Sequence, residues 1–124
     1  SDVYKRQGRD LGMKLITAVI QPSALDTVRL ELAKAGISGL TISEAAGYAR
    51  QKGHTEVYRG AEFTIDFLEK VRVEVLCTDE EFENVVETIC DAARTGEIGD
   101  GKVWSSDVQD VIRIRTGERG PAAI

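Results

Sequence analysis

Two helical patterns of apolar residues, each placed between runs typical of strands, constrain the fold of this chain more than any other feature. Residues 25–35 carry apolar side chains at every third or fourth position, and residues 82–93 repeat that spacing. Strands are predicted at the β-branched run 14–21, at 40–47, at the alternating run 71–75 and from residue 102 onward. The predicted order of elements is therefore strand, helix, strand, strand, helix, strand.

Local end signals support both helices. Pro22 ends the first strand, Ser23 is expected to cap the first helix, and Gly36 follows as its stop. Thr78 and Glu81 have the spacing of a capping box before the second helix. We therefore expect both helices to begin and end close to these residues.

This βαββαβ order predicts an α+β, ferredoxin-like fold, in which a four-stranded antiparallel sheet carries both helices on one face. The second sheet face then lacks cover, so a closed homo-oligomer is expected. Residues 48–64 are polar, punctuated by glycine and without persistent periodicity, so they are predicted to form a long functional loop between strands 2 and 3.

Composition excludes several classes of protein. A chain of 124 residues fits one domain, and its net charge of −5 argues against general nucleic-acid binding. No apolar run approaches the roughly 20 residues of a membrane span, and residues 1–12 lack a signal-peptide core, so a cytoplasmic location is expected. Cys77 and Cys90 are interpreted as reduced thiols without a chemical role. Residues 1–12 are treated as an extension, either a cloning remnant, a misassigned start or a native tail.

The segment from Thr95 to Trp104 has the composition of an anion site. Three glycines there can turn successive backbone amides toward one anion, and Lys102 adds a positive charge. On an extended strand, Arg113 and Arg115 would point to the same face. The segment fits neither a P-loop nor a dinucleotide fold, and an ordinary glycine turn beside solvated arginines explains the pattern about as well.

An enzyme that transfers or hydrolyses phosphoryl groups would use similar residue types, but the remaining parts of such a site are missing from the sequence. His54 is the only histidine, and no activated nucleophile or pair of metal-binding carboxylates is recognisable. We therefore expect no enzyme, with at most slow hydrolysis of a bound phosphate compound.

Three motifs in order resemble the PII signal-transduction proteins. They are Gly-Tyr-Ala-Arg-Gln-Lys-Gly-His at 47–54, Thr-Glu-Val-Tyr-Arg-Gly-Ala-Glu-Phe at 55–63, and Thr-Gly-Glu-Ile-Gly-Asp-Gly-Lys-Val-Trp at 95–104. The resemblance implies one domain over 13–124, with a flexible loop at 48–64, a phosphate loop at 95–102 and a C-terminal loop at 116–124. It also implies a homotrimeric sensor with ATP or ADP in each cleft between subunits.

The same resemblance assigns the nucleotide site. Gly99, Asp100, Gly101 and Lys102 would cradle the phosphates, and Arg50 would add a cation. Arg113 and Arg115 would reach in from the neighbouring subunit, while Thr41, Gly47 and Leu76 would line the base and sugar; without the resemblance, core packing explains Leu76 equally well. Ala49 and Gln51 complete the implied nucleotide-binding set.

The family also implies a second effector, 2-oxoglutarate, bound beside Mg²⁺ and ATP. The side-chain oxygen of Gln51 would bind the Mg²⁺ ion, the Gly53 amide would lie nearby, and Lys70 would pair with the distant carboxylate. This assignment is chemically consistent, because a 2-oxo acid and ATP phosphates both supply the hard oxygen ligands that Mg²⁺ prefers. Without the resemblance, the alternative interpretation of Lys70 is an exposed residue at the start of a strand.

Target proteins would contact the segment 48–64. Tyr58 and Arg59 are the candidate contacts, and an ammonium transporter or nitrogen-metabolism enzymes are the implied partners. A solvated loop arginine is the alternative reading of Arg59. Membrane association would arise only indirectly, through a transporter.

Four residues depart from the family pattern. Phe63 replaces the tyrosine that is nucleotidylated in many relatives, so no modification is expected there, and Ala61 removes a serine phosphorylated in others. Ala49 replaces a common glycine, and Gln21 stands where a basic residue is frequent near the effector. A nucleotide-only sensor, or a trimeric scaffold with a weakened 2-oxoglutarate response, therefore remains the alternative to the full sensor.

Overall fold

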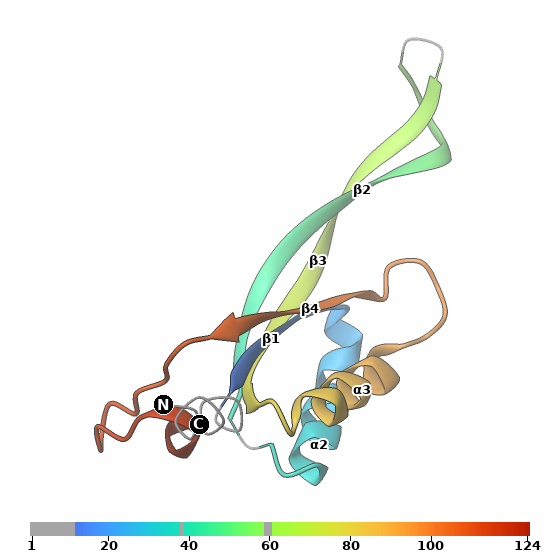
Figure 1. Ribbon diagram of the computed structural model, residues 1–124. Helices are drawn as coiled ribbons and strands as arrows, with labels where there is room; N and C mark the ends of the chain where they lie inside the picture. Colours follow the sequence, from blue (N-terminus) through green and yellow to red (C-terminus); the bar gives the residue numbers. More distant parts are fainter. Residues whose placement is uncertain (1–11, 38, 59–60) are drawn as a thin grey trace.

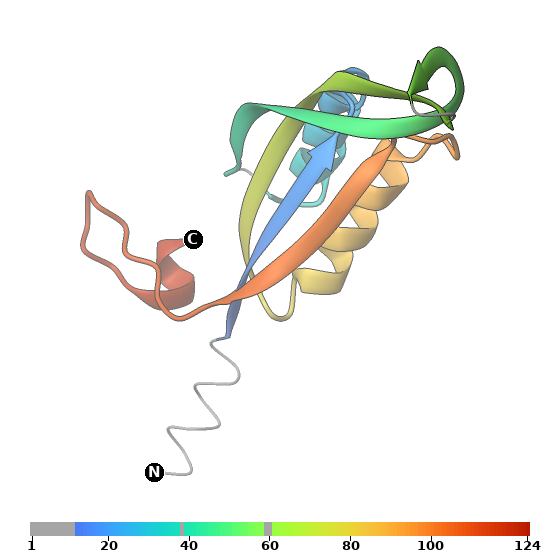
Figure 2. The same ribbon diagram turned by 90° about the horizontal axis from the view of Figure 1, so that it is seen from above.

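The computed structural model describes residues 12–37, 39–58 and 61–124, and within these the side chains of 12–37, 39–47 and 68–124. Its elements are β1 (Met13–Ile20), the 3-10 helix η1 (Pro22–Ala24), α2 (Leu25–Lys34), β2 (Thr41–Tyr58), β3 (Ala61–Thr78), α3 (Phe82–Ala93), β4 (Gly101–Val108) and the 3-10 helix η2 (Gly120–Ala123). The strands form one antiparallel sheet in the order β2-β3-β1-β4. Both helices pack on the same face of this sheet (Figures 1 and 2), which confirms the predicted ferredoxin-like fold.

The core lies between the helices and that face of the sheet. Alternate residues of β3, including Val73 and Val75, are fully buried, as is Ile16 on β1. Val85 on α3 and Leu32 on α2 are fully buried opposite them. Burial of side chains of this size stabilises the fold by roughly 1.5–3 kcal/mol each before chain entropy is subtracted.

The predicted helix ends are partly confirmed. Gly36 follows α2 with φ of 86°, and a capping box forms because the Thr78 backbone amide donates to Glu81 Oε1 while the Glu81 amide donates to Thr78 Oγ1. The expected cap at Ser23 is wrong. Pro22 begins a 3-10 turn that leads directly into α2, and no side chain caps either element.

The predicted loop at 48–64 is also wrong, because most of it is strand. β2 continues to Tyr58 and β3 begins at Ala61, so the two strands form a long hairpin that projects from the domain (Figure 1). The ladder has one irregularity, between Lys52 and Val57. Phe63, Ile65 and Phe67 alternate with more polar residues, which is a strand pattern that the prediction of a loop overlooked. Residues 48–52 show no such pattern, and they pair with this strand through backbone hydrogen bonds.

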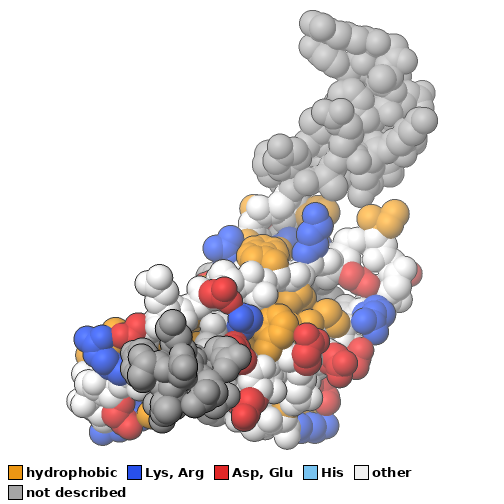
Figure 3. Space-filling view, in the orientation of Figure 1, with side chains coloured by type: hydrophobic (Ala, Val, Ile, Leu, Met, Phe, Trp, Pro, Cys, Tyr) orange, Lys and Arg blue, Asp and Glu red, His pale blue; other side chains and the backbone are white. Residues whose placement is uncertain are grey.

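The sheet face turned away from the helices keeps apolar surface exposed. Trp104 on β4 pairs in register with Thr17 and remains 49% exposed. Figure 3 shows hydrophobic side chains gathered among charged ones on the face that it presents. This arrangement agrees with the predicted need for cover from other copies of the chain.

The chain after β4 folds into a compact tail instead of the expected strand. Residues 114–116 form a turn, Ile112 bridges Arg119, and Gly117 adopts φ of 74°. An ion pair of 2.6 Å between Arg119 and Asp110 holds the two sides of this turn together. Arg113 and Arg115 therefore do not lie on one strand face, and part of the predicted C-terminal loop at 116–124 is the 3-10 helix η2.

Candidate functional site

The loop between α3 and β4 is held in shape by one carboxylate. Asp100 accepts hydrogen bonds from the Thr95 amide at 2.8 Å, the Thr95 hydroxyl at 2.5 Å and the Gly96 amide at 2.9 Å. The Thr95 hydroxyl bond is the main reason why the pKa of Asp100 lies below its usual value, and the two backbone amides add to it. Asp100, predicted to cradle phosphates, therefore also organises the loop that would do so.

Glycine is required at two positions of this loop. Gly99 and Gly101 adopt φ of 103° and 106°, in the region that side chains disfavour. A Cβ on Gly101 would lie 1.9 Å from the backbone oxygen of Val19, so only glycine lets the start of β4 approach β1 this closely. Lys102 follows directly on β4 and is exposed. The loop thus presents a short turn of backbone with a cation beside it.

Lys70, at the base of the β2/β3 hairpin, reaches this loop. Its Nζ donates to the Gly99 carbonyl oxygen at 2.5 Å in a partly buried hydrogen bond. A Cβ placed on Gly99 would lie 3.8 Å from Lys70 Nζ and 3.5 Å from Gln21 Nε2, so Gln21 also borders this point. Gly47 lies nearby, because a Cβ there would be 3.9 Å from Lys70 Cγ. Phosphate loop, hairpin base and the end of β1 therefore meet in one place.

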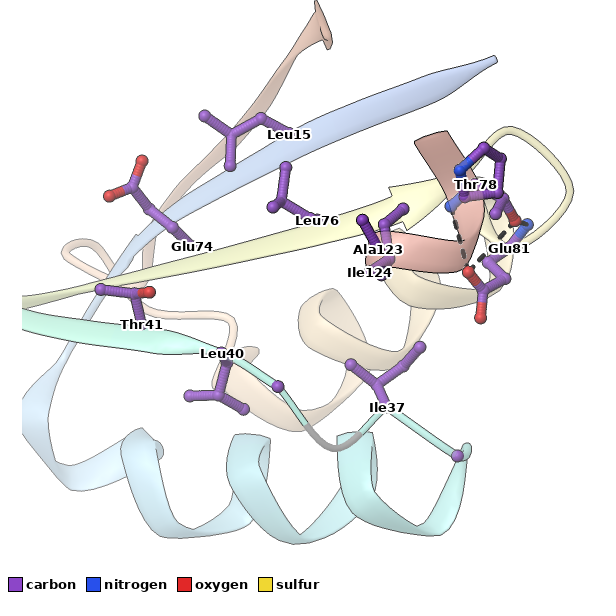
Figure 4. Close-up of a pocket in the computed structure, with 13 residues that line it drawn as sticks. Leu15, Ile37, Leu40, Thr41, Glu74, Leu76, Thr78, Glu81, Ala123 and Ile124 are labelled. Carbon is purple, nitrogen blue, oxygen red and sulfur yellow. Dashed lines mark hydrogen bonds between the residues drawn. The ribbon is translucent and has the colours of Figure 1, made fainter. Parts of the chain in front are cut away.

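A second candidate region lies toward the opposite end of the sheet. Thr41 and Leu76, both predicted to contact the base or sugar, line a cavity of about 660 Å³ (Figure 4). Leu15, Ile37 and Leu40 add apolar walls, and Glu74, Thr78 and Glu81 add polar groups. Pro121, Ala123 and Ile124 of the C-terminal tail close one side. A cavity that combines apolar walls with polar groups suits a nucleoside, whose base is a flat ring with polar edges.

The arginines predicted to bind phosphate lie in the C-terminal tail. Arg113 pairs with Glu118 at 2.8 Å and donates to the Ile124 backbone oxygen at 3.4 Å. Arg115 is exposed within the turn. Gly47, predicted to lie with Thr41 and Leu76, is absent from the lining of their cavity and belongs to the region around Lys70 instead.

Several predicted contacts fall in the outer hairpin, where only the backbone is described. Ala49 pairs with Asp66 in the ladder, so its extended backbone requires no positive φ. Arg50, Gln51, Gly53 and Tyr58 lie on β2, Phe63 lies on β3, and their side chains, like Arg59 as a whole, lie outside the described residues. Among the residues that the structure does describe, no cluster of His, Cys, Asp and Glu could hold a metal ion. None of the described helices is long and apolar enough to cross a membrane.

Two features of the site were missed in the sequence. The tether from Lys70 to Gly99 joins residues 29 positions apart, and no local pattern signals a contact of that separation. The closing role of Asp100 could have been found, because an aspartate in a short turn commonly accepts hydrogen bonds from backbone amides a few residues away.

Comparison with known proteins identifies the family. Residues 13–118 match the model of the family described as Nitrogen regulatory protein P-II. The proteins of that name from Rhizobium meliloti (strain 1021) and Nostoc punctiforme are 57% and 53% identical over 112 residues, which span 90% of this chain and all of each relative.

Solved structures agree with this result. A GlnK–ATP complex from B. subtilis has a TM-score of 0.80 at 30% identity, covering 93% of this chain and 98% of that one. Arabidopsis thaliana PII bound to citrate has a TM-score of 0.76 at 36% identity, covering 91% and 92%. The fold, the site geometry and these similarities together show that this chain belongs to the P-II family of nitrogen regulatory signalling proteins.

Proposed function

We propose that the protein senses nitrogen, carbon and energy status by binding ATP or ADP and, with Mg-ATP, 2-oxoglutarate. The observation that carries this proposal is the separation of two complementary half-sites in one chain. The phosphate loop meets β1 at Ile20, whereas the cavity lined by Thr41 and Leu76 includes Leu15, five residues or roughly 17 Å back along that strand. Each half-site therefore needs the other half from a neighbouring subunit.

The direction of the strands extends this argument to the arginines. β4 runs antiparallel to β1, so it starts beside Ile20 and ends beside Met13, carrying the tail toward the opposite end of the sheet. Arg113 therefore lies at the cavity end, away from Lys102 in the same chain. In a homotrimer, one subunit would supply Gly99, Gly101 and Lys102, and the next would supply the nucleoside cavity and its arginines.

The chemistry of both half-sites suits a nucleoside polyphosphate. Backbone amides in a glycine turn, Lys102 and the arginines would distribute several positive or partially positive groups around the phosphates, which offsets their lost hydration. The named ATP complex of the B. subtilis relative supports this ligand for the family. Within one subunit, Thr41 and Leu76 would then contact the ribose and base in the cavity of about 660 Å³.

The second effector would bind at the base of the hairpin. Lys70 is a partly buried cation beside the phosphate loop, which suits one carboxylate of 2-oxoglutarate. The Gln51 side chain would contribute one oxygen ligand to Mg²⁺, and ATP and the keto acid would supply further oxygen ligands. The Arabidopsis relative bound to citrate supports a polycarboxylate ligand in this family.

The hairpin would carry the signal to target proteins in the cytoplasm. It projects from the domain (Figure 1), so a change at its base can move the outer hairpin, to which Tyr58 belongs and which Arg59 follows in the sequence. Targets that bind one arrangement better than another would report the effector state in proportion to that difference in affinity. An ammonium transporter or nitrogen-metabolism enzymes are the proposed partners, with membrane contact only through the transporter.

Calorimetric titration of ATP with Mg²⁺, with and without saturating 2-oxoglutarate, tests this proposal. The full sensor predicts that 2-oxoglutarate tightens ATP binding and that ATP tightens 2-oxoglutarate binding by the same factor. ATP binding without any response to 2-oxoglutarate would indicate a nucleotide-only sensor, and a trimer that binds no nucleotide would indicate a scaffold. Steady multiple turnover of ATP that Asp100→Asn abolishes would indicate an enzyme instead.

A further inference from the structure

The hydrogen bond between Lys70 and Gly99 joins two parts of the molecule that lie 29 residues apart in the sequence. Lys70 lies on β3 at the base of the projecting hairpin, whereas Gly99 lies in the loop that leads into β4. The bond is 2.5 Å long, is partly buried, and joins a charged donor to a backbone acceptor. Charge-assisted bonds of this kind are about twice as strong as neutral ones.

We propose that Lys70 is a positioning residue, which ties the phosphate loop to the hairpin base and holds that loop ready for an anion before any effector binds. The proposal deepens the proposed function and rests on it for the identity of the nucleotide. It differs from a role as a carboxylate partner, because the tether acts in the protein without ligand. Movement at the hairpin base and the shape of the phosphate loop then become linked.

The conformation of the loop shows why such a tether is needed. Gly99 and Gly101 both have positive φ, and glycine is the residue that loses most conformational freedom on ordering. Three bonds to Asp100 fix the start of the loop at Thr95 and Gly96. The pairing of Gly101 with Ile20 fixes its end.

Between these two fixed points, Gly99 is held by Lys70. The Lys70 ammonium is also among the groups that lower the pKa of Asp100, behind the hydrogen bonds from Thr95 and Gly96, so its charge reaches the carboxylate that organises the loop. Gln21 borders the same point but does not carry charge. Loss of the cation would therefore weaken the loop at Gly99 and raise the pKa of Asp100.

Hydrogen exchange of the trimer without ligand tests the tether, using Lys70→Met to remove the ammonium while keeping an unbranched side chain. Lys34→Met is the matched control, because Lys34 is an exposed lysine on α2 whose loss changes the net charge equally. We expect amides of residues 95–102 to exchange at least about tenfold faster in Lys70→Met and to be unchanged in Lys34→Met. Exchange rates equal to those of the wild type would overturn the proposal.

Two further measurements separate positioning from general stabilisation. An NMR titration should show a higher pKa for Asp100 in Lys70→Met than in Lys34→Met, and equal values would contradict the tether. Titration of ATP without any dicarboxylate should show affinity reduced about tenfold in Lys70→Met alone, whereas a residue that only pairs with 2-oxoglutarate would leave this affinity unchanged. If the wild-type trimer binds no ATP, the proposed function fails, while the exchange result still decides the tether.

Discussion

The close approach of β4 to β1 makes Gly101→Ala the most informative single substitution. The added Cβ would lie 1.9 Å from the Val19 oxygen, 2.9 Å from the Val19 carbonyl carbon and 3.2 Å from Ile20 Cα. All three neighbours are backbone atoms of β1, so no side chain can turn aside to make room. The strand would have to move, and with it the pairing of Ile20 with Gly101 that anchors the phosphate loop.

Two contributions make up the expected loss of stability. Forcing a residue with a Cβ into φ of 106° costs about 1 kcal/mol, and pushing apart a packed backbone costs a further 1–3 kcal/mol or so. The free energy of unfolding should therefore fall by about 3 kcal/mol, a large share of the roughly 5–15 kcal/mol of a typical domain. The corresponding fall in Tm is on the order of 10 °C.

Gly96→Ala isolates the conformational contribution. Gly96 lies in the same loop with φ of 85°, but a Cβ there meets nothing within 4 Å. Urea and thermal unfolding, followed by circular dichroism at one fixed protein concentration, should show Gly96→Ala losing only about 1 kcal/mol. If Gly101→Ala is no less stable than Gly96→Ala, the tight contact between β4 and β1 does not exist in solution and the account of the loop is refuted.

Three further predictions concern local interactions. Glu81→Ala should destabilise the protein by about 1 kcal/mol in urea unfolding because Thr78 loses its reciprocal cap, and an unchanged midpoint would contradict the capping box. Asp100→Asn should lower the free energy of unfolding at pH 7, and this loss should shrink as the pH falls below 3.8, because the pKa of Asp100 in the folded protein lies below its ordinary 3.8 and the stabilisation disappears as the pH falls through the folded value. A difference independent of pH would contradict this. A thiol reagent at pH 8 should modify the half-buried Cys90 before Cys77, since burial raises the Cys77 pKa to about 11, and equal rates in the native protein would contradict that burial.

The parts of the fold that bury apolar side chains could be predicted from the sequence. Val73 and Val75 alternate with charged residues, and Val85 and Ile89 lie four apart, so each pattern records which face meets the core. The fold class follows from the order of such patterns. Gly36 also marks the end of α2 correctly, because its positive φ is a local requirement that the residue type itself reveals.

The hairpin and the tail were predicted incorrectly. Phe63, Ile65 and Phe67 do alternate as in a strand, and this signal was overlooked. Their partners at 48–52 lack such a pattern, because the backbone hydrogen bonds of a ladder do not depend on side-chain type. Arg113 and Arg115 have the spacing of neighbours on one strand face, but the turn at 114–116, held by the Asp110–Arg119 ion pair, interrupts any strand. The two-residue spacing of these arginines, which is typical of a strand, therefore predicted the wrong geometry for this segment.

The candidate site was only partly accessible to sequence analysis. The glycine loop was found because Gly99 and Gly101 are signals of unusual backbone, whereas the role of Asp100 in closing it was overlooked although its hydrogen bonds are local. Gly47 was assigned to the nucleoside region with Thr41 and Leu76, whereas within one chain it lies beside Lys70, at the other half-site. The separation of the two half-sites along β1 appears only when the strands are placed in register.

Mixing of subunits tests the central claim, that each nucleotide site is assembled from two chains. Lys102→Gln damages the loop half-site and Arg113→Gln damages the tail half-site, so each homotrimer should bind ATP far more weakly than the wild type. When the two variants are co-expressed in equal amounts, random assembly restores about one interface in four, and calorimetry should find about one wild-type-affinity site per four subunits. Mixed trimers that recover no binding, although the wild type binds ATP, would contradict a site shared between subunits.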